Sequence, residues 1–576
     1  MDSTSISIAL SGSGGTGVMT AGSLLLDVAA RAGYYGLMTR TLGPQIRGGE
    51  AAALMRLGVA EIRSPDDAYH MLLALDWGNI ERFAAEIPLN AESIVISDPA
   101  HGPVPEVIAS TGARLVEIPL GPLAATVADG RPNMVALGVL TALLGLTHEH
   151  TTAVVAAELA DRDDETLAAS LGAVQAGFSA ADPCVCPVTL APPASTATGT
   201  PRWALSGNEA TGAGALRGGV RFVAAYPITP ATDILEYLAV HLPRLGGALV
   251  QAEDELASIN MILGSSFGGT PSLTATSGPG LALMTESIGL GIASEVPVVI
   301  CNVMRGGPST GIPTKSEQSD LNIAIHGVHG DAPHVVTAPT SISDCVFTTQ
   351  WSVHLAECLQ VPVITLSDQA MGQARTVIDA PAIVPLNGQR KLATTTVEHY
   401  ERYEVTADGI SPMALPGTPG LEYTADGLEH SPRGTPSTQA AHHQEQLDKR
   451  QRKLLQFDYG PFWADIAGDG GIAILTWGSV TGAAMEAAER LRKGGVAVKV
   501  IAMRLLSPAL PDRLADALVG VDRVLVVEQS HSQQFLHYLR GHFALPARTR
   551  PHARPGPVSI RPAEIMAAVD DLFQEA

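Results

Sequence analysis

The chain has 576 residues, of which 46% are hydrophobic and 16% are charged, and its formal net charge is -22. This length corresponds to roughly three to five domains, and the apolar content rules out a long disordered or coiled-coil protein. So acidic a surface repels nucleic-acid phosphates and anionic membrane faces, so we expect no nucleic acid and no membrane as partners. No apolar run approaches the ~18 residues of a membrane span. Residues 1–5 lack the basic start of a secretory signal, and we expect a cytoplasmic protein.

Five cysteines are spread over the chain, and none of them forms a CxxC motif. A sparse, odd count is typical of a reducing compartment. An iron-sulfur cluster usually takes four cysteines, so we expect none on this chain. Cys184 and Cys186 lie one residue apart, too few for a closed metal site, and we predict no metal site here.

Two polar intervals divide the chain. Residues 187–202 are rich in proline, alanine, threonine and serine without a hydrophobic period, which is typical of a linker. A second interval, 387–459, ends in a charged helical stretch and connects a middle module to a last one. We therefore predict modules at 1–186, 203–386 and 460–576. Strands alternate with helices in all three, which predicts the α/β class.

A glycine-rich turn follows the first apolar strand of the chain. Residues 6–10 alternate as a strand, 12–17 read GSGGTG, and a periodic helix follows. This order favours a phosphate held by backbone N–H groups. Thr39 and Arg40 stand where an NAD site would place an acid, which favours coenzyme A or NADP. The alternative is a turn needed only for close strand-helix packing. The predicted phosphate contacts are Gly12, Gly14, Gly15, Gly17, Arg40 and Arg47.

The middle module opens with a short buried strand, Phe222 to Ala225, followed by the sequence YPITP. Two prolines bracket Thr229 at the strand end, where open α/β sheets bind ligands. A second interpretation makes Thr229 the N-cap of the next helix, with Pro230 at the first helical position. Both interpretations are compatible with the sequence.

Three acids, Glu253, Asp254 and Glu255, follow the next strand and begin a helix. Such acids ordinarily stabilise the helix dipole and are solvated, so a functional role competes with that reading. A further strand ends in Thr276, Ser277 and Gly278 before another helix. Because every strand ends in turn residues, we predict a parallel sheet whose carboxyl edge is crowded with polar groups.

The loop after the strand at 297–303 reads MRGGPSTGIPT. Its arginine, Arg305, can grip a carboxylate through two hydrogen bonds. The hydroxyls of Ser309, Thr310 and Thr314 and the peptide N–H groups can complete an anion site. We therefore predict a substrate-binding loop at this position.

In this order, YPITP, QAEDE, TATSGPG with the following MTE, and RGGPSTGIPT resemble the alpha subunit of the 2-oxoacid:ferredoxin oxidoreductases. The N-terminal module, with its glycine loop, GPQIRGGE and NMVALG, resembles the gamma subunit of that family, so gamma and alpha look fused. Thr16 stands where the family's glycine loop commonly has glutamine. The alternating strands and helices of the last module resemble a transketolase-type C-terminal domain.

The resemblance implies thiamine diphosphate as cofactor and a buried glutamate that activates its aminopyrimidine. Glu255 is the first choice for this residue and Glu253 the second. It places Thr229, Arg305 and Thr314 around the substrate carboxylate, with Thr229 and Arg305 counted among the catalytic residues. The residues expected to bind the cofactor are Tyr226, Pro227, Ile228, Glu255, Thr276, Ser277 and Gly278.

A partner is implied as well, because this chain lacks parts of the chemistry. Thiamine enzymes hold Mg²⁺ and diphosphate with GDG and a later asparagine. Gly468 to Gly470 read GDG, but no asparagine follows in the last module, so we interpret GDG as a turn before a strand. We expect a beta subunit to carry Mg²⁺, the diphosphate site and a [4Fe-4S] cluster, in an α2β2 assembly that reduces ferredoxin.

Together these features predict a subunit of a coenzyme A-dependent 2-oxoacid:ferredoxin oxidoreductase, with 2-oxoglutarate as the favoured substrate. Within the class, the alternatives are pyruvate and branched-chain 2-oxoacids. Outside it, the alternative is a non-catalytic nucleotide-binding assembly protein. Glu255 and Arg305 argue against that alternative, because a scaffold has little need for a strand-end acid and an anion-gripping loop together.

Overall fold

The computed structural model describes residues 3–43, 49–182, 185–186, 188–193, 202–393 and 399–574. The chain forms two compact units. The first contains residues 1–206 together with two returning segments, 373–381 and 558–563. The second contains 207–372, 382–557 and 564–576. Two segments distant in sequence therefore complete the N-terminal unit, which sequence patterns gave no reason to expect.

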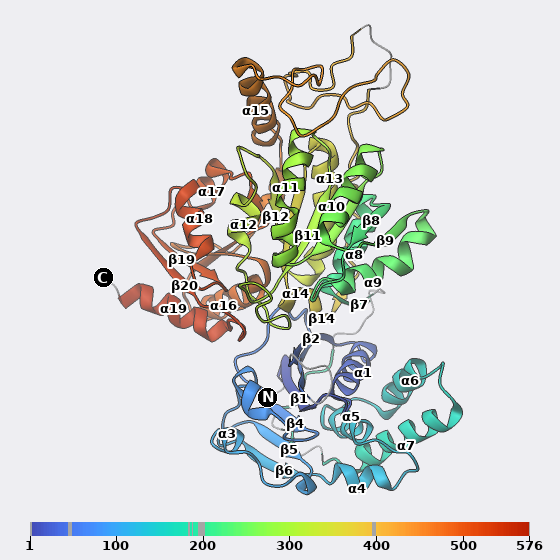
Figure 1. Ribbon diagram of the computed structural model, residues 1–576. Coiled ribbons are helices and arrows are strands. Elements are labelled where there is room, and N and C mark those ends of the chain that lie inside the picture. The colour runs from blue at the N-terminus through green and yellow to red at the C-terminus, as the bar shows by residue number, and fades with distance from the viewer. Residues whose placement is uncertain are drawn as a thin grey trace. The chain divides into compact units, whose positions relative to one another are not determined.

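The first unit is built on an eight-stranded mixed sheet (Figure 1). In spatial order its strands are β6 (Arg114–Glu117), β5 (Ile94–Ser97), β4 (Met71–Ala74), β1 (Ser5–Ser13), β3 (Glu50–Gly58), β2 (Tyr35–Leu42), β14 (Arg375–Asp379) and β7 (Arg202–Ser206). Its helices are α1 (Val18–Arg31), α2 (Ile80–Phe83), α3 (Glu106–Ala109), α4 (Leu120–Ala125), α5 (Pro132–Leu143), α6 (His148–Glu158) and α7 (Asp164–Ala180). The central strand β1 pairs in parallel with β4 and antiparallel with β3. The predicted strand at 6–10 is confirmed and is longer than expected.

The second unit contains a seven-stranded sheet and a five-stranded sheet. The larger sheet has the order β18 (Leu505–Ser507), β12 (Val335–Thr337), β13 (Val363–Asp368), β11 (Val299–Met304), β10 (Ser272–Thr276), β8 (Phe222–Ala225) and β9 (Ala248–Gln251). All of its pairings are parallel except that of the edge strand β18. The predicted parallel sheet is confirmed. Because parallel strands end at the same edge, the loops after β8, β9, β10 and β11 gather on one side.

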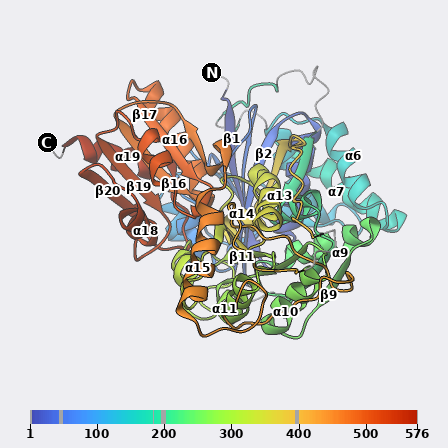
Figure 2. The ribbon, with the colours of Figure 1, turned by 90° about the horizontal axis from the view of Figure 1, so that it is seen from above.

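Helices cover both faces of this larger sheet, as parallel strands require. They are α8 (Gly207–Gly218), α9 (Thr232–His241), α10 (Glu255–Phe267), α11 (Gly278–Ala293), α12 (Leu321–His326), α13 (Ile342–Leu359) and α14 (Gln369–Gln373). Figure 2 shows α10 and α11 on one face of β11 and α13 on the other. The buried strands read as apolar runs, and VICNVM of β11 has one polar residue, Asn302, in its middle.

The smaller sheet has the order β15 (Ala464–Ala467), β17 (Val498–Met503), β16 (Ile472–Trp477), β19 (Arg523–Glu528) and β20 (Arg548–Ala553). Helices α16 (Thr481–Lys493), α17 (Pro511–Ala517), α18 (Gln534–His542) and α19 (Pro562–Gln574) accompany it. One continuous apolar core contains residues of both sheets. The GDG sequence forms the turn between β15 and β16, with Gly468 and Gly470 at positive φ, as interpreted from the sequence. The proposed domain limits stay a prediction, although the shared core joins the middle and last modules.

The connecting interval contains α15 (Ala440–Leu455), which carries a buried charge cluster. Lys449 Nζ lies 2.8 Å from Glu295 Oε1, and Lys453 Nζ lies 3.2 Å from Glu295 Oε2, with all three side chains at most 1% exposed. Burial alone would raise the pKa of Glu295. The charges of Lys449 and Lys453 outweigh it and hold that pKa below the ordinary value. The cluster fastens α15 to the end of α11.

We expect the substitution Glu295→Gln to destabilise the protein by about 3–5 kcal/mol, because it leaves two buried ammonium groups without a counter-charge. Thermal unfolding monitored by circular dichroism measures this, with the exposed Glu404→Gln as the matched control. Since the folded-state pKa of Glu295 lies below its unfolded value, its stabilising effect is present above the unfolded value and is lost as the pH falls further. An equal unfolding temperature for the two variants would contradict this role.

Candidate active site

The YPITP turn after β8 is held by two buried side chains from other elements. Arg305 Nη1 donates to the Thr229 carbonyl oxygen at 2.5 Å, and Asn208 Nδ2 of α8 donates to the Pro230 carbonyl oxygen at 2.8 Å. Helix α9 begins at Thr232 and has Ala231 as its N-cap. The interpretation of Thr229 as an N-cap is therefore wrong, because the turn extends two residues further than expected. The Thr229 side chain is exposed at the sheet edge.

The rest of this turn is less buried than a core strand end. Tyr226 is 40% exposed, while Pro227 and Ile228 are half-buried. Ile228 packs against the hydrophobic core, and this contact anchors the turn. The turn therefore presents one aromatic ring and one hydroxyl at the carboxyl edge of the sheet.

The three acids after β9 have different environments. Asp254 is the N-cap of α10 and its Oδ1 accepts a hydrogen bond from Ala257 N at 2.6 Å. Glu253 and Asp254 are exposed, whereas Glu255, the first helical residue, is only 7% exposed. The dipole-stabilising role expected of such acids therefore belongs to Asp254. Glu255 is the acid that points into the protein.

Glu255 lies beside the turn that follows β10. A methyl group on Gly280 would come within 2.7 Å of Glu255 Oε1 and 2.1 Å of Thr276 Oγ1, so the carboxylate and the hydroxyl both lie close to this glycine. Thr276 and Ser277 are fully buried, and α11 begins at Gly278. Only glycine allows so close an approach at position 280. The fold thus places a buried carboxylate against the N-terminal turn of α11.

The loop after β11 closes on itself above Arg305. Ile312 N donates to the Gly306 carbonyl oxygen at 2.8 Å, and Gly306 N donates to the Lys315 carbonyl oxygen at 3.0 Å. Gly311 has φ 55°, and a side chain there would strike the Gly306 carbonyl. The list of predicted hydroxyls divides by exposure: Ser309 and Thr310 are exposed and Thr314 is half-buried.

Arg305 itself is only 8% exposed and its Nε has no hydrogen-bond partner among the described residues. Ser277 Oγ and Asn302 Oδ1 are likewise buried without a partner there. Burial lowers the pKa of Arg305, and the nearby Asp320 carboxylate opposes this shift. Burial also raises the pKa of Asp320, against a hydrogen bond from Asn302 Nδ2 at 2.9 Å and the charge of Arg305. Buried polar groups are costly without partners, so their clustering here is typical of a ligand site.

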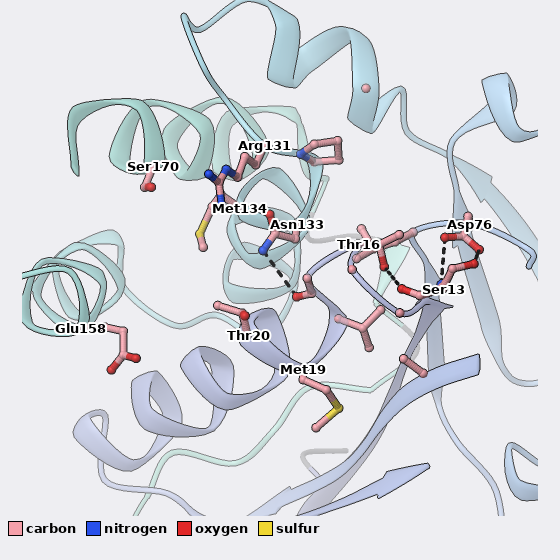
Figure 3. Close-up of a pocket in the computed structure, with 18 of the residues that line it drawn as sticks. Ser13, Thr16, Met19, Thr20, Asp76, Arg131, Asn133, Met134, Glu158 and Ser170 are labelled. Carbon is pink, nitrogen blue, oxygen red and sulfur yellow. Dashed lines mark hydrogen bonds between the residues drawn. The ribbon is translucent and has the colours of Figure 1, made fainter. Parts of the chain in front are cut away.

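The glycine loop of the first unit borders a cavity of about 1090 Å³ (Figure 3). Asp76 fixes the start of the loop: it accepts from Ser13 N and Ser13 Oγ, both at 2.9 Å. Thr16 Oγ1 donates to the Ser13 carbonyl oxygen at 2.7 Å, so the residue that replaces the family's glutamine helps to close the loop. Gly17, at φ 85°, is the N-cap of α1 and has no side-chain cap.

Three of the predicted glycines, Gly14, Gly15 and Gly17, line this cavity, together with two arginines that the sequence did not single out, Arg131 and Arg162. Gly12 belongs to β1 and is not among the lining residues. Arg40 does not line the cavity either, because its Nε donates to Gln373 Oε1 at 3.3 Å. Arg47 lies outside the described residues, as does Cys184.

Several functional residues were missed by sequence reasoning. Asn302 did carry a signal, because an amide inside an otherwise apolar strand has to find polar partners. Asn208, Asp76 and Arg131 lie in helices or turns of ordinary composition and had no such signal. Asp320 lies 15 residues after Arg305 in sequence, and only the folded loop places it nearby.

Family models match most of the chain. "Pyruvate ferredoxin/flavodoxin oxidoreductase" matches residues 7–180 and "Pyruvate flavodoxin/ferredoxin oxidoreductase, thiamine diP-bdg" matches 213–449. "Transketolase, C-terminal domain" matches 467–536. The 2-oxoglutarate synthase subunit KorA of Methanothermobacter marburgensis is 34% identical over 349 residues, which cover 59% of this chain and 91% of that protein. The chain belongs to the 2-oxoacid:ferredoxin oxidoreductase family.

A solved 2-oxoglutarate:ferredoxin oxidoreductase of this family, from Magnetococcus marinus, is 35% identical and superposes with a TM-score of 0.92 over 100% of both chains. That structure was determined with 2-oxoglutarate, coenzyme A and succinyl-CoA bound. The 2-oxoacid:ferredoxin oxidoreductase subunit alpha of Saccharolobus solfataricus is 35% identical over 57% of this chain, and the match spans 55% of that relative's length. The predicted family and the predicted thiamine-binding, transketolase-type and gamma-like modules are confirmed.

Proposed function

We propose that this chain is the alpha subunit, with a fused gamma-type module, of a coenzyme A-dependent oxidoreductase that converts 2-oxoglutarate to succinyl-CoA and reduces ferredoxin. The observation that carries the proposal is the meeting of a buried acid, Glu255, and a buried arginine, Arg305, at one edge of a parallel sheet. The choice of 2-oxoglutarate is supported by the relatives named for that acid.

The residues of the larger sheet's carboxyl edge fit thiamine diphosphate. Glu255 is buried beside Thr276, and the hydroxyl of Ser277 is buried without a partner among the described residues, as expected where a ligand completes the contacts. Bound thiamine diphosphate supplies a carbon nucleophile for the ketone and an electron sink for decarboxylation. Glu255 would hold a proton at a ring nitrogen of the aminopyrimidine. Tyr226, Pro227, Ile228 and Gly278 would form the walls around it.

Arg305 would bind the carboxylate of the 2-oxoacid. Its Nη1 is engaged by the Thr229 carbonyl, while its Nε has no partner among the described residues, so the guanidinium is oriented and still has a donor to offer. Thr229, Ser309, Thr310 and Thr314 would add hydroxyl donors from two loops. A guanidinium of such low exposure binds an anion more strongly than an exposed one, because little water competes.

The cavity beside the glycine loop would bind coenzyme A. Gly14, Gly15 and Gly17 offer backbone N–H groups, and Arg131 and Arg162 offer positive charge for phosphates. A beta subunit would carry Mg²⁺, the diphosphate site and a [4Fe-4S] cluster in an α2β2 assembly, with ferredoxin as electron acceptor. Among the described residues no group of three or more His, Cys, Asp and Glu side chains is placed to hold a metal ion. No helix in the described part of the chain is long and apolar enough to cross a membrane. We propose a cytoplasmic location.

The function is tested by co-expressing this chain with its beta subunit and assaying viologen reduction with coenzyme A and a panel of 2-oxoacids. We expect coenzyme A-dependent reduction with the highest kcat/KM for 2-oxoglutarate. A higher kcat/KM for pyruvate or a branched-chain 2-oxoacid would reassign the substrate. A colourless complex without 2-oxoacid-dependent reduction would favour the non-catalytic alternative.

For the activating acid, we expect Glu255→Gln to leave the complex assembled and to lower kcat by about 100-fold or more, because the amide cannot hold the proton that the ring nitrogen needs. The exposed Glu253→Gln is the matched control and should retain the kcat of the unaltered enzyme. Steady-state kinetics and size-exclusion chromatography give the two readouts. The opposite ranking of the two variants would move the activating role to Glu253.

For the coenzyme A site, we expect Arg131→Ala to raise the KM for coenzyme A about 10-fold and to leave the KM for the 2-oxoacid unchanged, since one charged contact to a phosphate is lost. Arg31→Ala, an exposed arginine at the end of α1 that does not line the cavity, is the control. An unchanged KM for coenzyme A would exclude this role for Arg131.

A further inference from the structure

Asp320 lies beside the candidate active site and belongs to none of the motifs that point to it. Its carboxylate makes two contacts with the ends of neighbouring strands. Oδ2 accepts a hydrogen bond from Asn302 Nδ2 of β11 at 2.9 Å. The same carboxylate lies against the backbone of Gly278, where an added methyl group would be 2.6 Å from Oδ1 and 2.7 Å from Oδ2. Asp320 thus connects β11 to the first turn of α11.

The third neighbour of Asp320 is Arg305, and the two opposite charges affect each other across the site. A guanidinium that is 8% exposed needs a counter-charge, because an uncompensated buried charge is strongly unfavourable. Arg305 Nη1 reaches only a carbonyl oxygen, which carries no full charge. Asp320 supplies the carboxylate, while Arg305 Nε keeps no partner among the described residues.

We propose that Asp320 is a positioning residue for substrate binding: it holds the guanidinium of Arg305 and the Ser277–Gly278 turn in the arrangement that receives the carboxylate of the 2-oxoacid. The inference rests on the proposed function, in which Arg305 binds that carboxylate. Asp320 acts through Arg305 and does not itself contact the substrate. Its negative charge opposes the incoming anion, so its benefit is orientation rather than attraction.

The test compares four variants of the complex with the beta subunit: Asp320→Asn, Arg305→Ala, the double variant, and the exposed control Asp331→Asn. Two quantities are measured for each, the steady-state KM and kcat for 2-oxoglutarate and the Kd of N-oxalylglycine, an unreactive 2-oxoacid analogue, by calorimetry. We expect Asp320→Asn to raise both KM and Kd about 10-fold with a smaller change in kcat. The control should match the unaltered complex.

The double variant gives the decisive comparison. If Asp320 acts through Arg305, adding Asp320→Asn to Arg305→Ala causes no further loss, because coupled residues are non-additive. Additive losses, an unchanged Kd, or tighter analogue binding by Asp320→Asn would each overturn the inference. An Arg305→Ala variant with unaltered KM and Kd would instead overturn the proposed substrate contact, so the two failures are distinguishable.

A second variant covers the case in which Asp320→Asn does not fold. Asn302→Ala removes the hydrogen bond on Asp320 Oδ2 and leaves every charge in place. We expect it to raise KM and Kd in the same proportion to each other, with again no further loss in the Arg305→Ala background. Normal values of KM and Kd for Asn302→Ala would overturn the inference.

Discussion

The parallel pairing of β8, β10 and β11 is the constraint on which the site depends. Their register, with Leu273 opposite Val223 on one side and Val299 on the other, makes the three strands end at the same edge. Thr229, Ser277 and Arg305 follow these strand ends, and Glu255 follows the neighbouring parallel strand β9. Residues spread over more than seventy positions therefore meet without any long loop. Each loop needs only to turn, because the sheet has already aligned the chain segments that carry it.

Collecting polar groups at this edge has an energetic consequence. Arg305, Asn302 and Ser277 are all nearly or fully buried and each keeps an atom without a partner among the described residues. Such groups are tolerated only where the surroundings compensate or a ligand does. The buried cluster around Glu295 shows the opposite arrangement, since both of its carboxylate oxygens have ammonium partners. One cluster is closed and serves to fasten α15, whereas the other is open and suits a substrate.

The two units divide the proposed chemistry between them. The glycine-loop cavity lies wholly within the first unit, and the polar sheet edge lies wholly within the second. The first offers backbone donors and arginines suited to phosphates, and the second offers an acid and an arginine suited to a ring nitrogen and a carboxylate. The sparse cysteines of the chain agree with a redox cluster on another polypeptide, which is why we propose the enzyme as a multi-subunit assembly.

The amino-acid sequence by itself determined the α/β class, the parallel sheet, the order of the motifs and the family, because apolar periodicity and turn residues are local properties of the chain. It left two acids, Glu253 and Glu255, as rivals, and it assigned a phosphate role to Arg40. Only the tertiary structure decided that Glu255 is buried, that Arg40 is occupied by Gln373, and that Asp320 reaches Arg305. Burial and counter-charge depend on segments distant in sequence, so no local pattern encodes them.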